Sequence, residues 1–84
     1  MSDLMKQIEE IILGAVPNAQ VIVRDPRNDG EHLEATVISE SFEGMTLVNQ
    51  HRQVMKPLKA AFAGDLHALA LKTYTPEKWA SAQG

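Results

Sequence analysis

The chain contains no cysteine, and only 5% of its residues are aromatic. Without cysteine, neither a disulfide nor a thiolate metal site can support the fold, which must therefore depend on packing alone. No apolar run approaches the length of about 18 residues that a membrane-spanning helix needs, and no signal-peptide pattern opens the chain. We expect a cytoplasmic protein, and the absence of cysteine fits a reducing compartment.

Sequence motifs of catalysis are also missing. No glycine-rich loop ends in Lys-Ser or Lys-Thr, and no serine lies in a nucleophile-elbow context. The three histidines, His32, His51 and His67, fall in three different predicted elements without the spacing of a metalloprotease. No set of residues meets the requirements of an active site, so we predict a protein that is not an enzyme.

Length and charge narrow the choice further. A chain of 84 residues has room for one core, so we predict a single domain over residues 1–84. The net charge of −3 argues against a protein dedicated to nucleic acid. Positive charge is nevertheless concentrated, because Arg52, Lys56 and Lys59 are the only charged residues between Met45 and Gly64.

Apolar periodicity predicts a helix at each end of the chain and three strands between them. Residues 3–16 carry apolar side chains at steps of three and four, and Pro17 ends this helix. Three segments rich in β-branched or alternating apolar residues are predicted strands: 20–25, 32–39 and 68–74. Thr75 caps the last helix, which is too short to be stable unless Trp79 docks onto the body of the domain.

Helical spacing returns between the second and third strands, but Pro57 interrupts it. Proline lacks the amide hydrogen and would clash with the carbonyl of Gln53 in a continuous helix. We therefore predict a short helical turn, a break around residues 50–56 and a second helix that Gly64 ends. The resulting order is α-β-β-α-α-β-α, an α+β fold with helices on one face of a three-stranded mixed sheet.

The crossover between the second and third strands predicts parallel pairing, which places the starts of both strands at one edge of the sheet. His32 and His67 lie at these starts. Alternation along the strands directs His67 towards the leucine face and His32 away from it, although the backbone can deviate at strand ends. Two imidazoles cannot complete a zinc or iron–sulfur site, so any metal would be shared with a partner that brings thiolates.

The third histidine lies on the segment that carries the positive charge. His51 shares a helical stripe with Met55, Leu58 and Phe62, which we interpret as the buried face, so it is a core or boundary residue or else a partner contact beside Arg52. Arg52, Lys56 and Lys59 project from one narrow stripe, either as a solvated face or as a docking patch for an acidic partner or phosphate. If the patch binds nucleic acid, Lys72 is a further candidate contact.

Two segments, SFEGMTLVNQHRQV and HALALKTYTPEKW, give the chain a resemblance to a known family. The chain resembles the BolA family from the first helix to Trp79. Its Gly44-Met45, Pro57-Leu58 and Tyr-Thr-Pro sequences are most similar to the short bacterial IbaG-like branch.

The resemblance implies a class II KH-like fold and a role as a partner of monothiol glutaredoxins. Separately, we expect the free protein to be a monomer. In such complexes a bridging [2Fe–2S] cluster has four ligands: a glutaredoxin cysteine, a glutathione thiol, the histidine that matches His67 and a hairpin-loop residue. That loop carries no cysteine here, so His32 is the candidate by position. The adaptor role that the resemblance implies serves iron–sulfur trafficking or iron or stress regulation. The same resemblance implies an alternative role as a DNA-binding transcriptional regulator that uses the basic helix, although the chain lacks the GXXG loop of KH domains.

Overall fold

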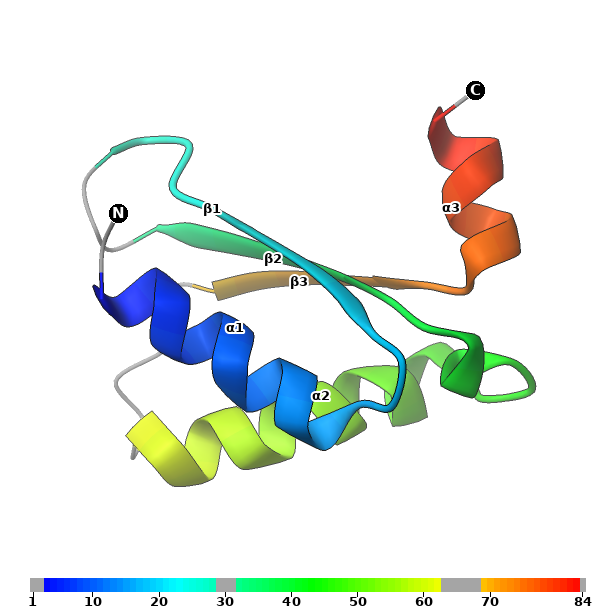
Figure 1. Ribbon diagram of the computed structural model, residues 1–84, viewed down its shortest axis with the longest axis horizontal. Helices are drawn as coiled ribbons and strands as arrows, with labels where there is room; N and C mark the ends of the chain where they lie inside the picture. Colours follow the sequence, from blue (N-terminus) through cyan, green and yellow to red (C-terminus); the bar gives the residue numbers. More distant parts are fainter. Residues whose placement is uncertain (1–2, 29–31, 63–68, 84) are drawn as a thin grey trace.

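Three helices and a three-stranded sheet make up the domain (Figure 1). The computed structural model describes residues 3–28, 32–62 and 69–83. Along the chain the elements are α1 (Asp3–Ala15), β1 (Gln20–Arg24), β2 (Leu33–Ile38), the short 3₁₀ helix η1 (Glu40–Phe42), α2 (Leu47–Phe62), β3 (Leu69–Tyr74) and α3 (Pro76–Gln83). The strand order in the sheet is β1-β2-β3.

The predicted hairpin is confirmed. β1 pairs with β2 in antiparallel register, with Gln20 opposite Ile38 and Arg24 opposite Glu34. The chain turns after β1, where the amide of Asn28 donates to the carbonyl of Asp25 at 3.1 Å. Asn28 has a φ of 53°, which asparagine tolerates better than most residues, so this part of the turn follows from its sequence.

The predicted parallel crossover is also confirmed. β2 pairs with β3 in parallel, and Leu33 and Leu69 are register partners at the starts of the two strands. The two strands therefore begin at the same edge of the sheet, which we call the strand-start edge.

Helices α1 and α2 cover one face of the sheet and enclose the core, as the sequence predicts (Figure 1). The main core cluster is drawn from α1 and the residue that follows it, β2, η1 and α2: Ile8, Ile12, Val16, Leu33, Ala35, Val37, Phe42, Val54 and Leu58. Leu33, Ala35 and Val37 alternate along β2 and all point inwards, whereas α3 extends from the end of β3 to the opposite side (Figure 1). One face of the sheet is thus packed, and the other is largely open.

The segment before β3 corrects one prediction. We expected a break around residues 50–56, but α2 is a single helix of 16 residues with Pro57 inside it. Val54 and Leu58, on either side of that position, are both fully buried, and burying two such side chains is worth about 3–6 kcal/mol. That gain is as large as the cost of about 3 kcal/mol for an interior proline, so the helix continues.

Among the described residues, no helix combines the length and apolar character needed to cross a membrane.

The buried line of α2 includes Leu58 as predicted, but in the first half of the helix it is shifted by one residue from the prediction. Gln50, Val54 and Leu58 are its buried residues, whereas His51 and Met55 are half-buried. His51 is therefore a boundary residue, which is one of the two structural roles that its spacing indicates.

Candidate functional site

The strand-start edge presents one histidine among the described residues. His32 directly precedes β2 and is exposed, and its neighbour Leu33 is buried in the core with only 3% of its surface exposed. Packing of Leu33 and its pairing with Leu69 fix the backbone next to the imidazole. His67, the other predicted ligand, lies outside the described residues, two positions before Leu69 in the sequence.

The donor atoms at this edge determine which metal chemistry the chain could support. Within 3–28, 32–62 and 69–83, no group of three or more histidine, aspartate or glutamate side chains is arranged to hold a metal ion. The chain has no thiolate to offer, and iron–sulfur clusters need four ligands that are mostly thiolates. Any iron–sulfur cluster at His32 would therefore need thiolate ligands from another molecule.

The predicted basic patch lies on the outward side of α2. Arg52, Lys56 and Lys59 are all exposed, at helical spacings of four and three residues. A shallow hollow of about 320 Å³ runs beside them, and it is lined by Val48, His51, Arg52, Met55 and Lys59. The structure thus brings His51, Arg52 and Lys59 together around one surface depression with an apolar floor.

This part of α2 also carries exposed apolar surface. Leu47 is 60% exposed and Val48 is 59% exposed. Neither was singled out from the sequence, because both fit the helical periodicity that normally marks a buried face. Exposed apolar side chains beside cations are typical of a protein-binding surface rather than of a purely solvated helix.

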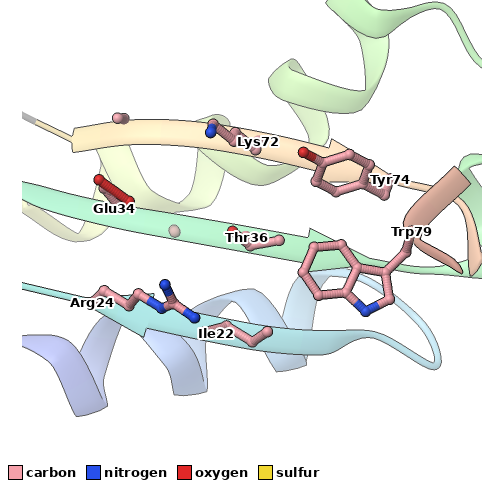
Figure 2. A pocket seen from close by; sticks show the side chains of 9 residues that line it. Ile22, Arg24, Glu34, Thr36, Lys72, Tyr74 and Trp79 are labelled. Carbon is pink, nitrogen blue, oxygen red and sulfur yellow. The ribbon is translucent and has the colours of Figure 1, made fainter. Parts of the chain in front are cut away.

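Lys72 is separated from the other predicted cations. It lies on β3 and lines a hollow of about 210 Å³ on the open face of the sheet, together with Arg24, Glu34, Thr36 and Trp79 (Figure 2). Helix α2 packs against the opposite face. The four residues predicted to contact nucleic acid therefore form two sites rather than one.

The C-terminal helix is anchored as the sequence predicts. The amide of Lys78 donates to Oγ1 of Thr75 at 3.3 Å, and the amide of Trp79 donates to the Thr75 carbonyl at 2.9 Å. The rings of Tyr74 and Trp79 are 5.2 Å apart between centroids, with an angle of 56° between their planes. This tilted contact holds the start of α3 against the end of β3.

The chain is similar to known proteins over most of its length. Residues 14–78 match the family described as BolA-like protein. The acid stress protein IbaG of Escherichia coli is 32% identical over 75 residues, which are 88% of this chain and 86% of that protein. The DNA-binding transcriptional regulator BolA of Vibrio cholerae is 43% identical over 54 residues, 64% of this chain but only about half (51%) of that protein.

A solved structure gives the same result for the fold. The structure of a bolA protein homologue from Coxiella burnetii superimposes with a TM-score of 0.73 at 34% sequence identity. The superposition covers 95% of this chain and 97% of that one. The two curated relatives carry the names of a stress protein and a regulator rather than of enzymes.

Proposed function

This chain belongs to the BolA family, and from that premise we propose that it is a non-enzymatic adaptor. In this proposal it binds a monothiol glutaredoxin and supplies imidazole ligands to a bridging [2Fe–2S] cluster, in iron–sulfur trafficking or in iron or stress regulation. The name of its Escherichia coli relative, an acid stress protein, agrees with a stress-related role.

One observation carries the proposal: an exposed imidazole stands at the edge where two parallel strands begin. His32 is the described residue there, and Leu33 and Leu69 hold the strand starts in register. The resemblance to the family adds His67 as the main ligand. A pair of imidazoles leaves two positions for sulfur, which the cysteine of a glutaredoxin and the thiol of glutathione would fill.

The chain's own residues would do three things at such a site. The imidazoles would bind iron in their neutral form, because a protonated ring has no lone pair to donate. Strand β2 would hold His32 through the buried neighbour Leu33. The surface formed by Val48, His51, Arg52, Lys56 and Lys59 would dock an acidic surface of the partner. The cluster itself, when bound, supplies the one-electron chemistry.

The test is reconstitution of the mixed cluster. The protein, a monothiol glutaredoxin, glutathione, ferrous iron and sulfide are combined, and visible absorption and circular dichroism are recorded. We expect the spectrum of the mixture to differ from that of the glutaredoxin alone, and His67→Ala and His32→Ala each to remove that difference in whole or in part. Lys78→Ala is the control, because Lys78 is exposed on α3, which follows the opposite end of β3 from the strand-start edge. An unchanged spectrum in the His32→Ala/His67→Ala variant would rule out both ligand assignments.

Binding of DNA is the second candidate, and one observation favours it. Three exposed cations follow one line on α2, and the Vibrio cholerae relative is named as a DNA-binding regulator. If Arg52, Lys56 and Lys59 each neutralise a phosphate of duplex DNA, the plot of log affinity against log salt has a slope near −2.7, about −0.9 for each contact. Replacing any one of them by glutamine should reduce that slope by about 0.9. A slope that stays the same in all three variants would exclude this helix as the DNA contact.

A further inference from the structure

The open face of the sheet carries a hollow that neither proposed function uses. Figure 2 shows its side chains on the face away from α1 and α2, with Arg24, Glu34 and Lys72 towards one end and Tyr74 and Trp79 at the other. Its volume is about 210 Å³, enough for a small planar group. The site therefore combines aromatic rings with charged side chains in a single depression.

The strand register explains the depth of this hollow. On the open face, Arg24 lies opposite Glu34, which lies opposite Ala70 in the next strand. In the next row, Thr36 lies opposite Lys72. Short side chains, those of Ala70 and Thr36, thus form the floor, and long ones form the walls. A flat group lying on this floor would have one cation beside it from each of the two outer strands.

The aromatic end is held in place by the fold. Ile38 points to the open face, yet it is only 4% exposed and lies outside the main core cluster. Its register partner is Tyr74, whose ring contacts that of Trp79. Both rings are half-buried, so each retains accessible surface. Trp79 is thus fixed in position and still able to stack against a ligand.

The charges favour an anionic ligand whose negative groups are spaced apart. Two cations and one carboxylate line the hollow, whereas the chain as a whole is acidic. Arg24 and Lys72 stand on β1 and β3, which are two strand spacings apart, about 10 Å. Cations on strands this far apart can contact separate phosphates of one nucleic-acid strand.

We propose that this face binds single-stranded nucleic acid, with a base stacked on Trp79 and backbone phosphates at Arg24 and Lys72. Aromatic rings beside a cationic track are the features by which proteins bind single strands without reading their sequence. Duplex DNA fits poorly, because its bases are already stacked and are not available to Trp79. The site is on the opposite face of the sheet from α2, so it is separate from any duplex contact there.

Trp79 allows the site to be observed directly, because it is the only tryptophan in the chain. An unstructured oligothymidylate of about 12 nucleotides, within the usual range for single-strand sites, is titrated into the protein at several salt concentrations. We expect quenching of tryptophan fluorescence, with a slope of log affinity against log salt near −1.4, about −0.7 for each of two phosphate contacts. Absence of quenching together with absence of binding by fluorescein anisotropy would overturn the proposal.

Charge variants then test where the strand lies. Lys72→Gln and Arg24→Gln should each reduce the magnitude of the slope by about 0.7, while Glu34→Gln should raise the affinity by removing a negative charge near the phosphates. Lys6→Gln on α1 is the control for a change of charge alone, and it should leave binding unaltered, since Lys6 is exposed on the far layer. If Lys6→Gln and Lys72→Gln have equal effects, the attraction is diffuse and the proposed site is wrong.

Two further measurements separate the alternatives. Trp79→Ala should lower the affinity, followed by anisotropy of the labelled strand, by roughly 5- to 150-fold, the range for loss of one aromatic–base stack. If Trp79→Ala fails to fold, the variants at Lys72 and Arg24 still test the proposal, because both residues are exposed. Thymidine monophosphate should bind far more weakly than the oligonucleotide. Equal affinities for the two ligands would indicate a nucleotide pocket instead. Effects confined to Arg52→Gln and Lys56→Gln would assign the nucleic-acid strand to α2. Both results contradict the proposal.

Discussion

Replacing Thr73 by valine should destabilise the protein through one hydrogen bond between β3 and α2. The hydroxyl of Thr73 donates to Oε1 of Gln50 at 2.7 Å, and both residues are buried, with 8% and 7% of their surfaces exposed. Nε2 of Gln50 in turn donates to the carbonyl of Met45 at 3.0 Å and to that of Phe42 at 3.4 Å. Gln50 thus connects the strand to the loop that leads into α2, and its amide is fully used.

The size of the effect follows from what valine leaves behind. Valine has nearly the shape of threonine and suits a strand, so packing and strand propensity change little. Oε1 of Gln50 loses its donor in a site that water does not reach, which costs about 1–3 kcal/mol. For a domain of this size, each kcal/mol lowers the midpoint of thermal unfolding by about 4–8 °C. A loss of about 2 kcal/mol therefore predicts a decrease of roughly 8–16 °C.

Thermal and urea unfolding followed by far-UV circular dichroism measure this change, and Thr73→Ser is the matched control. Serine keeps the hydroxyl and loses one methyl group, at a cost of about 0.8 kcal/mol. The double variant Thr73→Val/Gln50→Met removes both partners, and we expect it to cost less than the sum of the single variants. If the valine variant unfolds at the same temperature as the unmodified protein, the hydrogen bond contributes nothing and our explanation of the buried glutamine is wrong.

Other predictions concern backbone conformation and pH. Gly14 and Gly44 both have open space where a Cβ would be added, but Gly44 has a φ of +79° and Gly14 lies in α1. Measured by thermal unfolding, Gly44→Ala should therefore lower the free energy of unfolding by about 1–2 kcal/mol, and Gly14→Ala should raise it by about 0.5–1 kcal/mol. Effects of the same sign would contradict this explanation. Pro57→Ala should raise the unfolding midpoint, because it restores a helical donor for the carbonyl of Gln53, and a lower midpoint would show that the half-buried ring is needed for packing. If imidazoles bind the mixed cluster, its visible spectrum should weaken on acidification, because a protonated ring cannot bind iron, and a spectrum that does not change with pH would argue against imidazole ligands.

Much of the fold could be predicted because local patterns agree with the tertiary structure. The alternation of Leu33, Ala35 and Val37 predicts the inward face of β2, and the crossover rule predicts that β2 and β3 are parallel. Pro57 shows where a local rule fails. The penalty for an interior proline is intrinsic to the residue, whereas the burial of Val54 and Leu58 that offsets it depends on α1 and the sheet, which are distant in sequence.

The candidate sites could be predicted only in part, for a related reason. His32 is predictable because its position depends on strand pairing alone. The hollow at Lys72 is not, because it forms only where Trp79 returns over the sheet from the following helix. Gln50 was also missed, since a polar residue on a helix gives no sign that three buried groups will bond to it. Strand alternation alone predicts that Glu34 and Thr36 lie on the face opposite to Leu33, Ala35 and Val37.

The arrangement of the sites makes the proposed functions separable by mutation. The sheet and its helical layer divide the surface into the strand-start edge at His32, the outward side of α2 at Arg52 and the open face at Lys72. Substitutions at distant sites without shared partners usually have additive effects. A variant that combines Lys72→Gln with His32→Ala should therefore lose single-strand binding and cluster binding to the same extent as each single variant. Non-additive losses would mean that the two ligands compete or are coupled, in which case the open face and the strand-start edge act as one surface.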